Sequence, residues 1–232
     1  MAFIARVVAV VLLTGGAAFA AEPVRSINIY VQPYYEAAKT PGEKPRVAVG
    51  RQFDALLASS RREDILAVRD RVLADPKVTT PMTMMVLAIR LYDIGLRDDA
   101  VFWFYAAKER AIVMSQVLEM DTRGLAQADD AARNFATLAG PVINGYAFCD
   151  QKNQKELHAK AIAWVEANPY QAMFMAQLPA KPGDRGENQR RALDTVKANA
   201  AKEAAYFDDP KNVESFYATR KRNEADVKYC WK

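Results

Sequence analysis

The sequence has a single histidine, His158, and only two cysteines, Cys149 and Cys230. A zinc site needs several His, Cys or acidic ligands at short spacing, and the chain has no such cluster. A Ser-His-Asp or Cys-His machine would have to use His158, whose neighbours at 155–160 are typical of a solvent-exposed helix face. We therefore predict no catalytic residue, no metal ligand and no cofactor-binding residue, and we expect a protein that is not an enzyme.

Long hydrophobic runs are also missing, and one short apolar run lies near the N-terminus. Arg6 precedes the apolar run 7–13, a Gly-Gly break follows, and small residues end at Ala20. This is the order of a secretory signal peptide, with cleavage after Ala20 or, as second choice, after Ala21. An uncleaved anchor helix is the alternative, but it would need about 20 continuous apolar residues. We predict removal of 1–20, a periplasmic or secreted mature protein, and no membrane span.

A strong excess of charge is absent as well, since the formal net charge is +4. The most basic stretch, 220–222, is short and lies beside Glu224 and Asp226. Binding to a nucleic acid needs a concentrated basic face. We therefore expect no nucleic-acid partner.

The even cysteine count has a simple reading in an exported chain. In an oxidising compartment two cysteines normally form a disulfide, so we predict a bond between Cys149 and Cys230. It would tie the C-terminus to the body of the protein and contribute about 4 kcal/mol in the chain-entropy model. Two buried free thiols are the alternative.

Hydrophobic spacing and capping signals predict an all-α fold with a short extended N-terminal arm. A strand or arm is expected at 27–31, and a capping box at Ser60–Glu63. Thr80 and Gly95 are expected to bound one helix as N-cap and left-handed C-cap. Helices are predicted from about Arg51 and over 81–94, 98–118, 122–138, 141–149, 154–167, 170–176, 187–207 and 212–229.

These elements group into four parts. The signal peptide covers 1–20, the arm 21–50 and a helical-hairpin core 51–178. A loop at 179–186, with two prolines and two glycines, then leads to two C-terminal helices in 187–232 that pack on the core.

One segment carries a family resemblance. Apolar, small and turn residues in 84–107 fall at the spacing of a tetratricopeptide-type helical hairpin; they are Leu87, Ala88, Leu91, Gly95, Ala100, Phe104 and Ala107. The segment resembles one such hairpin, which implies a degenerate helical-hairpin array. Proteins of that family mostly hold other proteins in a groove, so the resemblance implies a protein-binding scaffold.

Aromatic residues suggest where a partner could bind. Four consecutive rings at 102–105 sweep a full helical turn and cannot all face one core. Either Trp103 lies under a neighbouring helix, or Trp103 and Tyr105 contribute to a partner surface, as aromatic anchors commonly do. Tyr34 and Tyr35 are further candidates for partner binding.

Two other patterns have chemical alternatives that we consider weaker. Adjacent acidic residues at 129–130 and 208–209 point about 100° apart on a helix, as solvating or capping groups do. Methionines at 82–85 and 173–175 could serve Cu(I), but residues two apart on a helix diverge, which favours core packing.

Together these features favour a periplasmic protein-binding module, best read as an immunity protein or inhibitor that neutralises a toxin or effector delivered to the periplasm. A periplasmic scaffold or assembly factor meets the same criteria. A glycan-cleaving enzyme with a carboxylate-only site and a copper-handling protein are the remaining alternatives.

Overall fold

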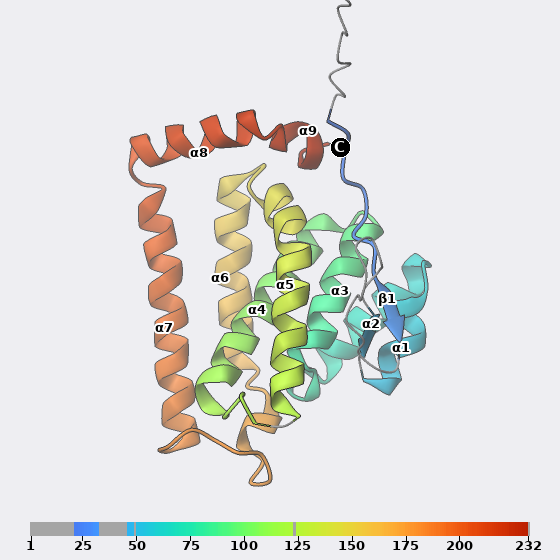
Figure 1. Cartoon of the computed structure of the whole chain (residues 1–232), viewed down its shortest axis with the longest axis vertical. Helices are drawn as coiled ribbons and strands as arrows, with labels where there is room; N and C mark the ends of the chain where they lie inside the picture. The colour runs from blue at the N-terminus through green and yellow to red at the C-terminus, as the bar shows by residue number, and fades with distance from the viewer. Residues whose placement is uncertain (1–20, 33–45, 49, 123, 232) are drawn as a thin grey trace, which may run out of the picture.

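Figure 1 shows the chain as a computed structural model, which describes residues 21–32, 46–48, 50–122 and 124–231. The predicted all-α class is confirmed. The predicted signal peptide, Tyr34 and Tyr35 lie outside the described residues. The α-helices are α1 (Arg51–Ala58), α2 (Arg62–Ala74), α3 (Pro81–Asp93), α4 (Arg97–Val117), α5 (Leu125–Ala147), α6 (Gln151–Ala167), α7 (Arg185–Tyr206), α8 (Pro210–Arg222) and α9 (Ala225–Tyr229), and the 3-10 helices are η1 (Pro76–Val78) and η2 (Gln171–Phe174). Within these ranges, no helix is both long and apolar enough to cross a membrane.

The N-terminal arm carries a short strand, which begins at Tyr30 and not at Ile27 as predicted. β1 (Tyr30–Gln32) pairs in parallel with β2 (Arg46–Ala48), with Tyr30 opposite Arg46. Ile27 and Ile29 precede β1 and are buried in the core. β2 was not predicted, because three residues are too few to show an alternating pattern.

The hairpin of α3 and α4 forms where its capping signals predict. The hydroxyl of Thr80 accepts a hydrogen bond from the amide of Thr83 at 3.0 Å, and Pro81 occupies the first turn. Gly95 has a φ of 82°, the left-handed conformation expected of a helix C-cap. A helical hairpin at 84–107 is therefore present.

Helix α4 is the centre of the fold. It packs against α3, α5, α6 and α7, and buried side chains occur along its whole length and on all its sides. A helix that is apolar on every side is stable only when it is enclosed. Trp103 and Tyr105 accordingly pack on Trp164 and His158 of α6, whereas Phe104 lies against Gly140 of α5.

The predicted break between two helices before Pro141 is wrong, because helix α5 runs through Pro141 without interruption. We predicted two helices, at 122–138 and 141–149, and a proline inside a helix normally kinks or ends it. The residue before a proline normally avoids the helical conformation because its Cβ clashes with the proline ring. Here that residue is Gly140, which has no Cβ, and its bare backbone also lies against Phe104.

Three further boundaries differ from the prediction. The expected capping box at Ser60 is wrong: α2 begins at Arg62, and the hydroxyl of Ser59 instead accepts a hydrogen bond from the amide of Arg61 at 3.0 Å. The predicted helix at 170–176 is a single 3-10 turn, η2. The predicted helix at 212–229 is broken at Glu224, which has a φ of 54° and separates α8 from α9.

Arg110 on α4 is buried, at 1% exposure, and binds backbone carbonyls in place of a carboxylate. Its guanidinium donates to the carbonyls of Pro76, Thr79 and Asn168, each at 2.7 Å, and stacks over Trp164 at 4.7 Å. Burial lowers the pKa of Arg110 to about 10. The side chain thereby ties η1 and the end of α6 to the central helix.

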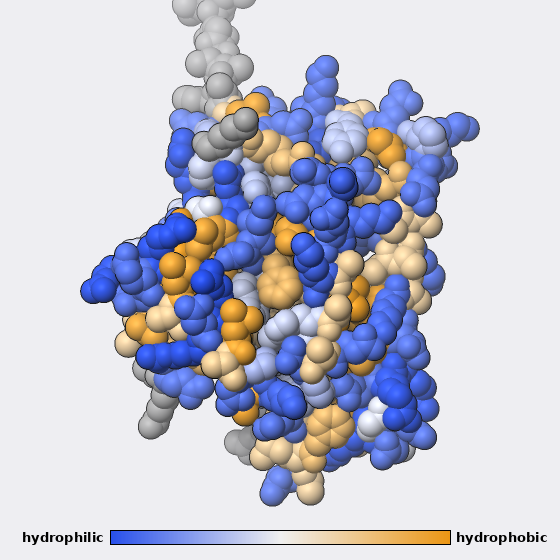
Figure 2. All heavy atoms as spheres, turned by 180° about the vertical axis from the view of Figure 1, so that it is seen from behind, coloured by the Kyte–Doolittle hydropathy of each residue, from blue (hydrophilic) through white to orange (hydrophobic). Residues whose placement is uncertain are grey.

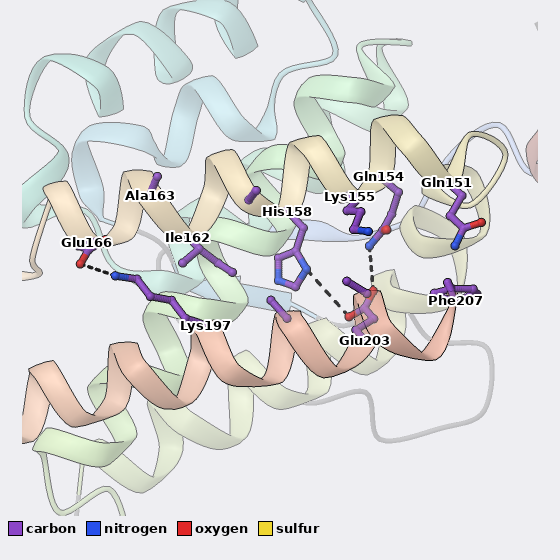
Figure 3. A pocket seen from close by; sticks show the side chains of 13 residues that line it. Gln151, Gln154, Lys155, His158, Ile162, Ala163, Glu166, Lys197, Glu203 and Phe207 are labelled. Carbon is purple, nitrogen blue, oxygen red and sulfur yellow. Dashed lines mark hydrogen bonds and ion pairs between the residues drawn. The ribbon is translucent and has the colours of Figure 1, made fainter. Parts of the chain in front are cut away.

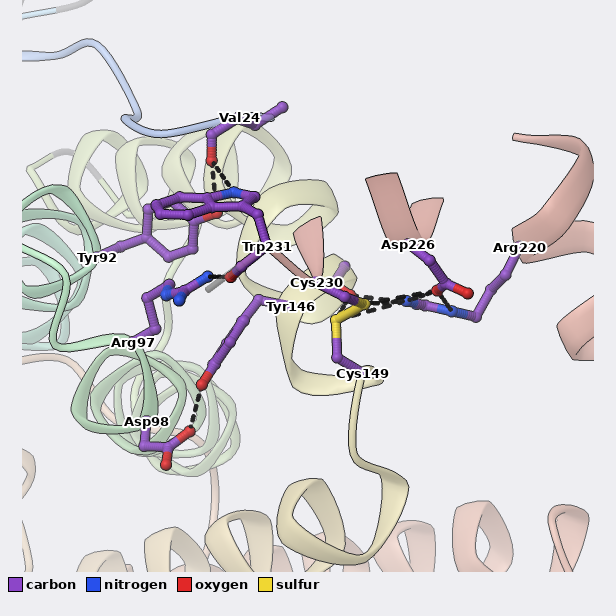
Figure 4. Close-up of a disulfide and its surroundings, with 11 residues drawn as sticks. Val24, Tyr92, Arg97, Asp98, Tyr146, Cys149, Arg220, Asp226, Cys230 and Trp231 are labelled. Atoms are coloured by element: carbon purple, nitrogen blue, oxygen red, sulfur yellow. Dashed lines mark hydrogen bonds and ion pairs between the residues drawn. A yellow bond between two sulfur atoms is a disulfide. The ribbon is translucent and has the colours of Figure 1, made fainter. Parts of the chain in front are cut away.

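A second group of contacts joins the two ends of the described chain (Figure 4). The carbonyl of Val24 accepts hydrogen bonds from the Tyr92 hydroxyl at 2.8 Å and the Trp231 indole at 3.2 Å. The guanidinium groups of Arg25 and Arg97 lie 4.5 and 4.1 Å from the centre of the Trp231 ring. The arm and the C-terminal tail therefore pack together at the α3–α4 turn.

The predicted disulfide between Cys149 and Cys230 is confirmed, with the two Cα atoms 5.5 Å apart. It fixes the tail to the end of α5 next to Gly145, where a side chain would collide with the Tyr229 ring. Arg220 lies over the same junction, donating to Asp226 at 2.8 Å and to the Gly145 carbonyl at 3.2 Å.

Reduction of the disulfide should lower the free energy of unfolding by up to about 4 kcal/mol, because the bond closes 81 residues of the unfolded chain. Guanidinium denaturation with and without reductant measures this loss. Intact mass after alkylation should show two added groups only when reductant comes first. Two thiols that react in the unreduced, unfolded protein would contradict the bond.

The substitution Arg110→Met should destabilise the fold by about 3 kcal/mol, because it leaves buried carbonyls without a donor. Chemical denaturation measures the change. Arg190→Met is the control, since Arg190 pairs with Glu187 on the exposed surface of α7 and its loss should change little. Equal stability of the Arg110 and Arg190 variants would show that the three carbonyl contacts do not hold η1 and α6 in place.

Candidate ligand-binding groove

A groove with a volume of about 380 Å³ runs between α6 and α7 (Figure 3). Its walls are formed by small side chains, because alanines occur one helical turn apart on both helices, at 159 and 163 on α6 and at 200 and 204 on α7. Ile162 lies between them, and Phe207 lines the far end. The middle of the groove is therefore apolar and open.

His158 lies in the floor of this groove, and the predicted solvent-exposed position is wrong. The residue is only 7% exposed, because α7 packs alongside α6 and covers the face that we expected to meet water. The imidazole stacks on Tyr105 with ring centroids 4.4 Å apart. Its Nε2 lies 3.0 Å from Oε1 of the buried Glu109.

A chain of hydrogen bonds continues from the groove into the core. The amide of Gln154 donates to the Tyr105 hydroxyl and to Oε1 of Glu203, both at 3.0 Å. The Tyr105 hydroxyl in turn lies 3.0 Å from Oδ1 of Asn144 and donates to it. Burial raises the pKa of Tyr105, so its hydroxyl keeps its proton. Side chains from α4, α5, α6 and α7 thus form one polar network at the groove.

Two polar atoms of the network face each other without a hydrogen bond between them. Nδ1 of His158 lies 4.0 Å from Oε2 of Glu203, beyond hydrogen-bonding distance. In Figure 3 the imidazole projects from α6 toward Glu203 on α7. The space between the two atoms belongs to the groove, which both residues line.

Charged residues occupy the rim. At one end Lys197 donates to Glu166 at 2.6 Å, which links α7 to α6 across the groove. Lys155 lies on the rim near the other end, and its side chain is exposed. The apolar stretch therefore lies between an ion pair at one end and the His158–Glu203 pair near the other.

The aromatic residues predicted to form a partner surface lie in the interior. Trp103 is 2% exposed and packs edge-to-face on Trp164 at 5.1 Å, and Tyr105 is 3% exposed beneath His158. The alternative of burial under a neighbouring helix is thus the observed one. The exposure that a partner-binding role of these two rings requires is missing.

The other predicted groups have structural roles. Asp129 and Asp130 both pair with Arg133, and Asp209 caps α8 by accepting from the amide of Lys211 at 2.9 Å. Met84, Met85 and Met173 are buried in the core. In the part of the chain that the structure describes, no group of three or more His, Cys, Asp or Glu residues could hold a metal ion.

Glu109, Gln154 and Glu203 were not predicted from the sequence. A usable signal existed for Glu109, since it lies in a helix that is apolar on all sides. A charged residue in an enclosed helix needs a buried partner. The sequence did not show that this partner is His158, 49 residues further along the chain.

On the face of the molecule seen in Figure 2, hydrophilic side chains dominate and apolar side chains are interspersed among them. Among the described residues, large exposed apolar side chains are spread over several elements; they are Leu73, Val78, Leu138, Phe174, Met175, Tyr206, Tyr217 and Val227. The α6–α7 groove is therefore the best-organised candidate site.

No model of a known protein family matches the chain, and no solved structure matches it. An uncharacterized protein of Haemophilus influenzae is 32% identical over 219 residues, which cover 94% of this chain and 84% of the relative. At this identity and coverage, the chain belongs to the same protein family as the Haemophilus influenzae protein.

Proposed function

We propose that this chain is an exported protein-binding protein that neutralises a toxin or effector in the periplasm, and that the α6–α7 groove receives the partner. The observation that carries the proposal is the groove itself, in which open apolar walls surround side chains held by a buried hydrogen-bond network. Binding sites commonly combine such walls with a few fixed polar groups.

Export is supported by two independent features. The segment 1–20 has the order of a signal peptide, and the disulfide between Cys149 and Cys230 belongs to a class of bond that persists in oxidising compartments. The resemblance of 84–107 to a protein-binding hairpin family supports the same class of function.

The carboxylate-only enzyme receives less support from the geometry. Such an enzyme needs two acidic groups facing each other across a cleft. The acidic residues that line the groove are Glu166 and Glu203, and Glu166 is already paired with Lys197. Glu109 is buried behind the imidazole of His158 and does not line the groove.

Site-specific crosslinking tests the groove as a partner site. A photoreactive phenylalanine at position 163 or 200, in the groove, should give one discrete adduct with another protein in periplasm of the native host. The same residue at Lys160 or Lys202, which are exposed on the same helices outside the groove, should give none. Adducts of equal yield at all four positions, or at none, would contradict the proposal.

A protection assay separates inhibition from scaffolding. The crosslinked protein, directed to the periplasm of a test strain, should arrest growth, and co-expression of this chain should restore it. A version without residues 1–20 should give no protection, and N-terminal sequencing of the protective form should begin near Ala21 or Glu22. A partner that is harmless on its own would favour the scaffold.

A further inference from the structure

The floor of the groove presents two hydrogen-bond acceptors to whatever enters it. The carboxylate of Glu109 can only accept a hydrogen bond, so a neutral imidazole beside it carries its proton on Nε2 and has its lone pair on Nδ1. Oε1 of Glu203 accepts from Gln154, which leaves Oε2 free to accept. Nδ1 of His158 and Oε2 of Glu203 lie 4.0 Å apart.

Two facing acceptors repel each other unless a donor lies between them. A single nitrogen can bridge them, because two hydrogen bonds of about 2.9 Å easily span 4.0 Å. A carboxylate or phosphate would add a third acceptor and is disfavoured. The site is therefore complementary to a donor, and most of all to a cation.

The charges around the site also favour a cation. Glu109 and Glu203 are acidic, and Lys197 is neutralised by Glu166. Lys155 is the remaining cation on the rim, and its exposed side chain can extend into water. The apolar stretch of Ile162 and the alanines continues directly from the acceptor pair.

We infer that the groove binds an ammonium group carried on an apolar chain, as presented by a lysine side chain of the bound protein. The ammonium donates to Nδ1 of His158 and Oε2 of Glu203, and the methylene chain packs against Ile162 and the alanine walls. A lysine has this form, with a compact three-donor head on a four-carbon stem. This inference specifies the chemical group that the groove binds. It rests on the proposed function for the claim that a protein partner carries that group.

The test uses n-hexylamine as probe, with n-hexanol and hexanoate as matched ligands, in NMR titrations of the whole mature protein at about pH 8. Hexylamine should shift the signals of His158 and of residues around Ile162. Hexanol and hexanoate should bind about tenfold more weakly or not at all, because they lack the charge-assisted hydrogen bonds.

Two variants locate the effect. Glu203→Gln keeps the shape and the contact with Gln154 but supplies its own donor to Nδ1, so hexylamine affinity should fall about tenfold. Ala163→Leu fills the apolar stretch and should abolish binding. Glu156→Gln is the control: it removes the same charge from an exposed position on α6 outside the groove and should leave the affinity unchanged.

The inference is overturned if hexanoate binds as well as hexylamine, if Glu203→Gln leaves the affinity unchanged, or if hexylamine does not bind the folded protein. Failure of the ammonium site and failure of the proposed function give different results. Hexylamine binding without a crosslinked protein would keep the ammonium site and remove the protein partner. A crosslinked protein without hexylamine binding would do the reverse.

Discussion

The enclosure of helix α4 on all sides is the constraint on which the rest of the structure depends. A charged side chain inside a protein is tolerated only when it is paired and hydrogen-bonded. Glu109 and Arg110 are consecutive residues of α4, and both are buried. Glu109 therefore engages His158 on α6, while Arg110 gathers carbonyls from η1 and from the end of α6. One helix thus sets the position of α6 at two points along its length.

The groove follows from the same arrangement. The edge of the imidazole that carries Nε2 is held by α4, so the opposite edge is directed toward α7. Alanines on α6 and α7 keep the space in front of it open, and the ion pair between Lys197 and Glu166 joins the two helices at one end. A fixed polar floor beneath open apolar walls loses little entropy when a ligand enters, which suits a binding protein.

Local signals predicted those parts of the fold that neighbouring residues determine. Thr80 and Gly95 marked the ends of α3, and two cysteines in a chain with a predicted signal peptide indicated one disulfide. Long-range packing decided the rest. Pro141 stays inside α5 because Gly140 relieves the clash, and His158 is buried because α7 covers it. The site lies between segments distant in sequence, so only the enclosed nature of α4 could have pointed to part of it.

The most direct test of this arrangement is to measure which ring nitrogen of His158 carries the proton. Because the chain has a single histidine, its ring nitrogens give one unambiguous set of signals in a long-range ¹H–¹⁵N NMR spectrum. At about pH 8 the account predicts a proton on Nε2, held by Glu109, and a bare Nδ1 facing the groove. A proton on Nδ1 would contradict it, because the groove would then present a donor to its ligand and not a pair of acceptors.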